Sequence, residues 1–293
     1  MFYNSKPGYL ERADYSWSSD SIRFINTPSL SARRTFFYVQ EAGYFKTEPP
    51  YFTERANLKS FLVFYTLSGE GRLDYANESH ILKPGSAAFI NCIDHHYYEC
   101  NKNNSWEFLW LHFNGPSALG YYEEFAKNGF HILNNDECKP VEQTMRSILS
   151  LLQAQNTNTE ILVSNHIVNL LTTLLTADNY EASDTYPMPD YLREVIKIIE
   201  NRFTEDLNLD YLSKESGISK FHLSRMFKNH MGITIKEYIL LKRINYAKEL
   251  LRYTDKTVDE VGYLCGFNHA SHFINMFKSY EGSTPNSFRT EWT

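Results

Sequence analysis

Two kinds of hydrophobic periodicity divide the chain. Between Thr35 and Phe113, short runs of β-prone residues are separated by turn signals rich in Gly, Pro, Asn and Ser, which predicts many short strands forming a barrel or jelly roll. The runs cover residues 36–39, 61–65, 71–75 and 87–90. Further along, apolar residues recur every three or four positions, which predicts helices. The pattern therefore indicates a multidomain α+β chain.

The first helical region has two predicted helices. Residues 141–152 carry their apolar side chains on one helical stripe. Residues 161–177 are apolar over more than one face, so part of this helix can pack on the barrel and part on another subunit. Packing within one chain alone is the alternative. The polar stretch at 178–189 contains Pro187 and Pro189 and reads as a linker.

The last hundred residues contain one helical unit twice. Leu212–Thr234 and Val261–Thr284 align so that Gly217 pairs with Gly266, and the Met-Phe-Lys run at 226–228 repeats at 276–278. Each copy predicts a helix, a glycine turn and a second helix. Two such units in one chain are typical of paired helix-turn-helix DNA readers.

The second helix of each copy has a polar side that suits DNA. In the first copy Phe221 lies among polar residues one turn from Arg225, a combination that fits methyl contacts and guanine recognition in a major groove. In the second copy Asn268 and His269 stand at the helix start, where phosphate contacts are favoured. For any single residue, an ordinary solvated helix face is the alternative.

These matches resemble the AraC/XylS family of bacterial transcription regulators over residues 190–292. The carriers include Leu212, Gly217-Ile218-Ser219, residues 223–228, Arg243, Gly266-Phe267, Thr284-Pro285 and Phe288-Arg289. The resemblance implies two three-helix subdomains joined by a long helix at about 234–253. It departs from the family at Asn275, where Arg is usual, so the second helix would read DNA weakly or contact adenine. The expected DNA-binding residues are Ser219, Lys220, Phe221, Ser224, Arg225, Lys228, Asn268, His269, Ala270, Ser271, Ile274 and Asn275.

The order of turns in the β region resembles the cupin-like effector domain of sugar-responsive AraC relatives. The matching stretches are residues 67–71, 82–85 and His95-His96. Metal cupins carry a His-x-His pair before the first of these turns, whereas residues 56–61 contain no histidine. His80, His95 and His96 are too few and wrongly spaced for a metal site. We therefore expect no metal, no cofactor and no enzyme, with a metal-cupin enzyme fused to a DNA reader as the least favoured alternative.

A small-molecule pocket is the preferred interpretation of the barrel. Along residues 106–113, Trp106, Phe108, Trp110 and His112 share one strand face, and aromatic faces with a few polar groups suit sugars. By resemblance to the arabinose-responsive regulator, Trp110 matches a sugar-stacking tryptophan, Arg55 a sugar-binding arginine and Tyr97 a pocket tyrosine. The alternatives are barrel core for the aromatic face, above all Phe108, and a surface ion pair of Arg55 with Glu54 or Glu48. The expected effector-binding residues are Arg55, His95, Tyr97, Trp110 and His112.

Charge and cysteine content indicate what DNA affinity and which cellular compartment to expect. The net charge is −6, but residues 187–293 hold 15 Lys and Arg against 14 Asp and Glu. The excess of acidic residues therefore lies in the N-terminal part. Non-specific DNA affinity should therefore be modest, and base contacts and dimerisation should favour specific sites. The four cysteines show no CxxC or zinc spacing, and no apolar run suggests a membrane span. We expect a reduced, cytoplasmic protein.

The sequence thus predicts a ligand-responsive, sequence-specific DNA-binding regulator, an activator of carbohydrate-utilisation genes that senses a sugar. Expected partners are double-stranded DNA, RNA polymerase and a second copy bound through helices at 137–177. A constitutive dimeric regulator, whose barrel senses another metabolite or nothing, is the alternative. The N-terminal arm would fold over the ligand or be an ordinary disordered terminus. The predicted parts are an arm (1–34), a cupin-like barrel (35–116), a helical dimerisation segment (117–178), a linker (179–189) and a double helix-turn-helix domain (190–293).

Overall fold

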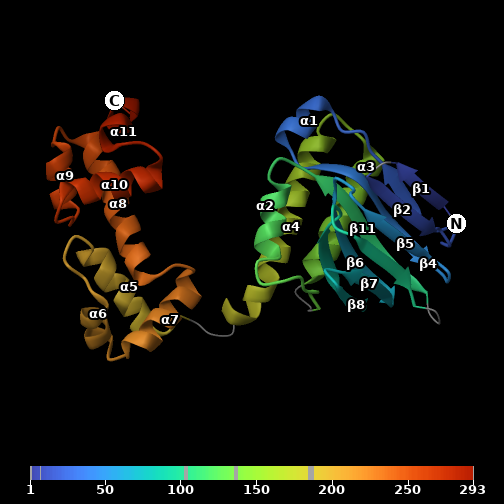
Figure 1. Ribbon diagram of the computed structural model, residues 1–293, viewed down its shortest axis with the longest axis horizontal. Coiled ribbons are helices and arrows are strands. Elements are labelled where there is room, and N and C mark those ends of the chain that lie inside the picture. Colours follow the sequence, from blue (N-terminus) through green and yellow to red (C-terminus); the bar gives the residue numbers. More distant parts are fainter. Residues whose placement is uncertain (1, 7, 102–104, 135–137, 184–187, 293) are drawn as a thin grey trace. The chain divides into compact units, whose positions relative to one another are not determined.

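The computed structural model describes residues 2–6, 8–101, 105–134, 138–183 and 188–292 (Figure 1). The chain divides into two compact units, Met1–Ala182 and Ser183–Thr293. We call them unit 1 and unit 2. Unit 1 carries the sheets and unit 2 consists of helices, as the multidomain α+β prediction required.

Unit 1 is built on two antiparallel sheets. In the first, the strand order is β1 (Phe2–Lys6), β2 (Tyr9–Asp14), β5 (Phe52–Ala56), β10 (His96–Cys100), β7 (Gly71–Tyr75) and β8 (Glu78–Leu82). In the second it is β3 (Ile22–Ile25), β4 (Tyr38–Thr47), β11 (Trp106–Asn114), β6 (Phe61–Gly69) and β9 (Ala87–Asn91). The predicted cupin-like arrangement of short strands is confirmed.

Strand alternation gives unit 1 two separate cores. Along β11, Trp106, Phe108 and Trp110 belong to the core between the sheets, whereas Leu109 and Leu111 belong to a second core. Phe108 is 1% exposed and packs against several other aromatic rings, so its interpretation as core is confirmed. The same face of β11 also carries His112, which follows Trp110 along the strand and is buried.

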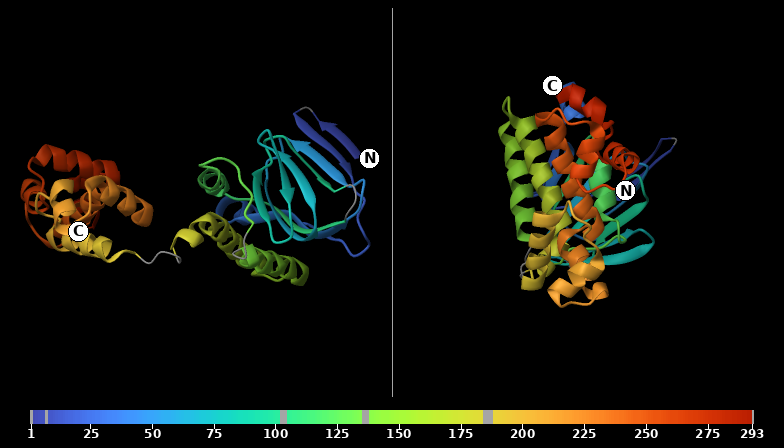
Figure 2. Two further views of the ribbon diagram at one scale, coloured as in Figure 1. Left: turned by 90° about the horizontal axis from the view of Figure 1, so that it is seen from below. Right: turned by 90° about the vertical axis from the view of Figure 1, so that its left-hand side faces the viewer.

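Helices cover the outer face of the second sheet (Figure 2). They are α2 (Ala118–Phe125), α3 (Lys139–Ala154) and α4 (Thr159–Ser183). Within α4, the stretch Thr159–Ala177 is the one described segment long and apolar enough to cross a bilayer. Its side chains at Ile167, Leu170 and Leu171 are fully buried in the second core.

The first 34 residues, which lack clear periodicity, contribute strands to both sheets. β2 pairs with β5, and β3 pairs with β4. Helix α1 (Leu30–Thr35) follows, with Ser29 as its N-cap. The backbone N–H and hydroxyl of Ser29 donate to the two carboxylate oxygens of Glu160, over 2.7 and 2.6 Å. This segment is therefore joined to the first turn of α4.

Unit 2 contains the two predicted helix-turn-helix copies. The first comprises α5 (Asp190–Arg202), α6 (Leu209–Ser216) and α7 (Lys220–Met231), and the second α9 (Val258–Leu264), α10 (Ala270–Glu281) and α11 (Pro285–Trp292). The long helix α8 (Ile235–Tyr253) joins them and begins in a capping box formed by Thr234 and Glu237. Gly217 ends α6 in the left-handed conformation, which glycine adopts without strain. Each copy has its own apolar core.

Arg243, on α8, ties the two copies together. Its guanidinium donates to the carbonyl oxygens of Phe203, Glu205 and Gly266, each over 2.7 Å. Phe203 and Glu205 follow α5 of the first copy, whereas Gly266 lies in the turn of the second. One side chain therefore fixes the turn of the second copy against the first.

Candidate effector pocket and DNA-reading surface

A row of polar residues crosses the inner face of the first sheet. Glu11, Arg55 and His96 are directly opposite one another on β2, β5 and β10. On the facing sheet, Glu41 and His112 are opposite one another on β4 and β11. Because residues at paired positions point to the same side of a sheet, the strand register gathers these groups between the sheets.

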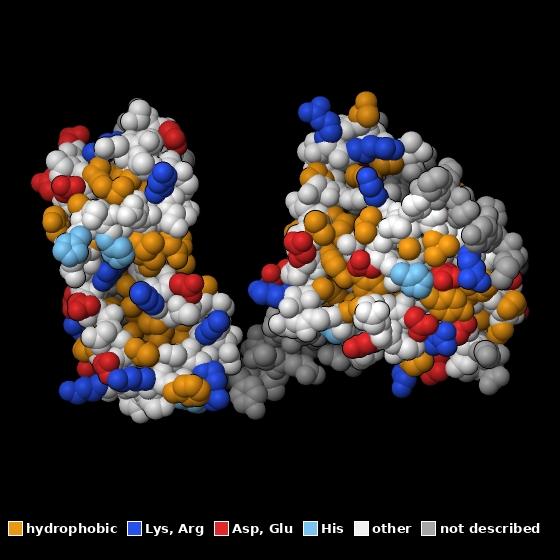
Figure 3. Space-filling model, in the orientation of Figure 1, with side chains coloured by type: hydrophobic (Ala, Val, Ile, Leu, Met, Phe, Trp, Pro, Cys, Tyr) orange, Lys and Arg blue, Asp and Glu red, His pale blue; other side chains and the backbone are white. Residues whose placement is uncertain are grey.

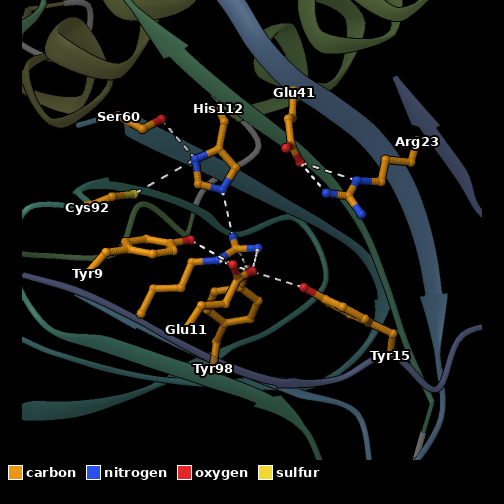
Figure 4. A network of polar contacts seen from close by, with 10 residues as sticks. Tyr9, Glu11, Tyr15, Arg23, Glu41, Ser60, Cys92, Tyr98 and His112 are labelled. Atoms are coloured by element: carbon orange, nitrogen blue, oxygen red, sulfur yellow. Dashed lines mark hydrogen bonds and ion pairs between the residues drawn. The ribbon is translucent and has the colours of Figure 1, made fainter. Parts of the chain in front are cut away.

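The centre of this cluster is a largely buried ion pair between Glu11, which is labelled in Figure 4, and Arg55. Arg55 Nε and Nη2 donate to Glu11 Oε1 over 3.0 and 2.7 Å. The hydroxyls of Tyr15 and Tyr9 donate to Oε1 and Oε2 over 3.0 and 2.7 Å. Burial alone would raise the pKa of Glu11, but attraction to Arg55 and these hydrogen bonds outweigh it and lower that pKa. The carboxylate is therefore ionised at neutral pH.

His112 continues the network as a neutral imidazole. Arg55 Nη1 lies 3.1 Å from His112 Nε2, and because a guanidinium can only donate, Nε2 is the acceptor. The proton is therefore on Nδ1, which donates to the Ser60 hydroxyl over 2.9 Å. Burial, reinforced by the charge of Arg55, holds the pKa of His112 well below its usual value.

A cavity of about 130 Å³ opens beside this network. It is smaller than the ~300–1,000 Å³ of most ligand pockets, so only a small molecule fits without movement of the chain. At its wall Arg23 and Glu41 form a second ion pair of 2.8 Å, and Gln40 Oε1 is buried with no hydrogen-bond partner. The lining residues are Tyr9, Glu11, Arg23, Gln40, Glu41, Arg55, Leu58, Ser60 and His112.

The structure brings together some of the expected effector residues. Arg55 and His112 line the cavity, and Arg55 pairs with Glu11 instead of Glu54 or Glu48. Trp110 does not line this cavity; it lines an adjoining space of about 10 Å³, room for one water molecule, and its Nε1 has no hydrogen-bond partner. A ring could stack on Trp110 only if the neighbouring aromatic residues moved.

His95 and Tyr97 lie elsewhere. His95 is exposed and bonds to Glu54 over 3.0 Å, and Tyr97 stacks on Phe52 on the outer face of β10. The inward positions of β10 are His96 and Tyr98, which alternate with Tyr97. The structure therefore does not group His95 and Tyr97 with Arg55, Trp110 and His112.

The sequence did not reveal the site residues that come from the first 34 residues, which we call the N-terminal segment. Glu11 pairs with Arg55, Tyr9 and Tyr15 donate to Glu11, and Arg23 lines one side of the cavity. A faint signal exists in the alternation of Tyr9, Glu11 and Ala13 along β2, with Ala13 fully buried. Because two of the inward positions are a tyrosine and a glutamate, β2 lacks the apolar alternation by which a half-buried strand is recognised from sequence.

All twelve expected DNA-binding residues lie on or just before α7 and α10, and all are exposed or half-buried. Phe221 is 79% exposed, and the Arg225 guanidinium lies over its ring at 6.0 Å. Lys220 forms an ion pair with Asp210. On α10, Ser271 and Asn275 are exposed and Ile274 is half-buried. Figure 3 shows Lys and Arg interspersed with Asp and Glu on one face of unit 2, as its near-neutral charge requires.

Within the described part of the chain, no group of three or more His, Cys, Asp or Glu residues could hold a metal ion. All four cysteines are free and buried.

Comparisons with known families agree with this architecture. Residues 38–171 match the family described as AraC-like ligand binding domain, and residues 212–291 match a helix-turn-helix domain family. A β-rich ligand-binding domain joined to a paired helix-turn-helix domain defines a class of DNA-binding transcription regulators. The chain belongs to the AraC family of these regulators.

Individual relatives are distant. The chain is 22% identical to the Msm operon regulatory protein of Streptococcus mutans and 21% identical to the lactose operon transcription activator of Staphylococcus xylosus. Each match covers 79% of this chain and 84% of the relative. Among solved structures, the C-terminal domain of AraT, a response regulator from Geobacillus stearothermophilus, is 27% identical, with 36% of this chain and 88% of that chain covered and a TM-score of 0.35.

Proposed function

We propose that this AraC-family protein is a sequence-specific activator of carbohydrate-utilisation genes, controlled by a sugar bound in the cavity of unit 1. The observation that carries the proposal is the lining of that cavity. Four charged side chains and a neutral imidazole line a cavity of about 130 Å³. The names of the Streptococcus and Staphylococcus relatives, the Msm operon regulatory protein and a lactose operon transcription activator, support the link to sugar use.

The chemistry of the lining suits hydroxyl groups. A sugar hydroxyl both donates and accepts, so it can bridge a carboxylate such as Glu41 and a cation such as Arg23 without disturbing their charges. Gln40 Oε1 offers an acceptor that no protein group uses. A buried polar atom without a partner costs free energy, and a rotation of the Gln40 side chain that lets Oε1 accept from a ligand hydroxyl would remove that cost.

Control of DNA binding requires that the ligand favour one arrangement of the protein over another. The N-terminal segment supplies Glu11 and Arg23 to the cavity and also holds Glu160 of α4 through Ser29. We propose this connection as the route from the cavity to the helix that precedes the linker.

The remaining partners follow from the same proposal. A homodimer would form through helices within 137–177, where Ile161 and Leu162 of α4 are exposed and available to a second copy. Double-stranded DNA would be contacted by the expected DNA-binding residues on and just before α7 and α10, and RNA polymerase would be recruited in the cytoplasm.

The test measures ligand and DNA binding by the full-length protein. Melting temperatures are recorded with mono- and disaccharides, and each sugar that raises them is added to a DNA-binding assay on a duplex selected by the protein from a random library. A ligand at about a hundred times its Kd should stabilise the protein by about 2.7 kcal/mol. Sugars that stabilise the protein and leave its DNA affinity unchanged would contradict control by the effector. A flat panel would favour a non-sugar effector or a constitutive dimer.

A matched pair of variants locates the site. The amides of Gln40 and Asn114 both donate to the carbonyl oxygen of Lys59, over 3.2 Å, but Gln40 lines the cavity and Asn114 does not. Gln40→Ala should weaken the sugar response, and Asn114→Ala should preserve it. Equal responses in the two variants would place the ligand elsewhere.

A further inference from the structure

We infer that Glu11 makes the cavity selective for uncharged ligands, and that it excludes sugar acids and sugar phosphates by occupying the anion-binding edge of Arg55. The inference rests on the proposed function insofar as it takes this cavity as the effector site. It goes further by assigning the charge class of the ligand to one residue of the N-terminal segment.

Arg55 is the side chain in this cavity to which an anion would be expected to bind. It is 8% exposed, and a buried guanidinium is a strong receptor for carboxylate or phosphate because its parallel N–H groups match two oxygens. Its Nε and Nη2 groups already bind Glu11 Oε1, and Nη1 lies on His112 Nε2. The edge that would bind an incoming anion is therefore occupied by the protein itself.

Glu11 is held too firmly for a free anion to replace it readily. Its two oxygens accept from Arg55, Tyr15 and Tyr9, and its backbone lies directly opposite Arg55 in the pairing of β2 with β5. A group already fixed within the same molecule binds without the loss of translational and rotational freedom that an anion from solution must undergo.

The charges around the cavity also balance without a ligand. Glu11 neutralises Arg55, and Glu41 neutralises Arg23. The remaining lining residues are uncharged side chains together with His112, which burial keeps neutral. An anion added to this site would bring an uncompensated charge into a buried space, which is costly, whereas a neutral polyol would not.

The proposal is tested by removing the resident carboxylate and supplying another. Full-length wild type, Glu11→Ala and Glu41→Ala are melted in sodium chloride and in sodium acetate at equal concentration. In Glu11→Ala, acetate should fill the vacated space beside Arg55. With a Kd about one tenth of the acetate concentration, the folding equilibrium would shift roughly tenfold, or about 3–5 °C in melting temperature.

The controls separate this effect from a general action of the salt. Wild type should show no preference for acetate, because Glu11 fills the site. Glu41→Ala should also show none, because Arg23 is partly exposed and can pair with water or chloride. Glu11→Ala with no acetate preference, or a wild type with the same preference, would overturn the inference.

A second measurement decides the matter if Glu11→Ala folds in neither salt. The wild type is melted with D-galactose and D-galacturonate, and with D-glucose, D-glucuronate and glucose 6-phosphate. The inference requires that no acidic member raises the melting temperature, and stabilisation by an acid overturns it. A flat response to the neutral sugars would count against the sugar effector only, because exclusion of anions would still hold.

Discussion

Gly266 lies so close to the carbonyl oxygen of Thr204 that a Cβ on Gly266 would stand 2.2 Å from it. Thr204 follows α5 of the first helix-turn-helix copy, and Gly266 is in the turn of the second. The equivalent glycine of the first copy, Gly217, has open space around the same position. Two glycines that correspond in the repeat therefore serve different purposes.

This difference predicts unequal costs of the same substitution. Both residues have positive φ, +68° at Gly217 and +84° at Gly266, so alanine at either costs about 1–2 kcal/mol in backbone strain. Gly266→Ala must also displace the Thr204 backbone, and it should destabilise unit 2 by at least about 2 kcal/mol more than Gly217→Ala. Urea denaturation of both variants measures this, and equal losses would show that the close approach is relieved without cost.

The Glu11–Arg55 pair should dominate the electrostatic stability of unit 1. Arg55→Met leaves the Glu11 carboxylate buried without its counter-ion, which should cost about 3–5 kcal/mol. Arg23→Met, at the partly exposed pair with Glu41, should cost less than about 1 kcal/mol. Chemical denaturation compares the two variants. Similar losses would mean that Glu11 finds other solvation once Arg55 is gone.

Acid should destabilise unit 1 through His96. Burial lowers the pKa of His96 to about 4, whereas an unfolded histidine titrates near 6.5. The unfolded chain therefore binds more protons between these values, so the stability is complete above pH 6.5 and falls as the pH is lowered toward 4. The contribution amounts to about 3 kcal/mol. Melting temperatures at pH 4.5–7 should depend less on pH in His96→Asn than in wild type, and the exposed neighbour provides the control variant His95→Asn. A wild-type slope in His96→Asn would remove His96 from this role.

Arg225 should determine sequence specificity in α7. Arg225→Ala is expected to cost roughly 1–3 kcal/mol on the selected duplex and little on random DNA, because a base contact is lost. Lys228→Ala on the same exposed side should weaken binding to both DNAs and reduce the salt dependence by about one ion. Fluorescence anisotropy at several salt concentrations distinguishes the two. A uniform loss in Arg225→Ala would assign it to the phosphate backbone.

The helical half could be predicted from sequence because its information is local. Apolar spacing and the repeated glycines define α6–α7 and α9–α10 within a few dozen residues. The pocket depends instead on pairing across long separations, such as the 44 positions between Glu11 and Arg55. A shift of one residue along β10 exchanges Tyr97 for its inward neighbours His96 and Tyr98. Such a choice of face follows from strand register, which the isolated strand does not reveal.

The contact between Ser29 and Glu160 spans 131 positions of the chain. During synthesis at ~5–20 residues per second, the N-terminal segment leaves the ribosome roughly 7–26 seconds before its partner on α4. Unit 1 therefore cannot complete its fold when only the sheets have emerged. The sheet face that α4 covers stays exposed to solvent until α4 has been synthesised. Nascent chains stalled before α4 has emerged should consequently be substrates for chaperones that bind apolar strands, whereas chains stalled near the end of unit 2, with α4 outside the ribosome, should not.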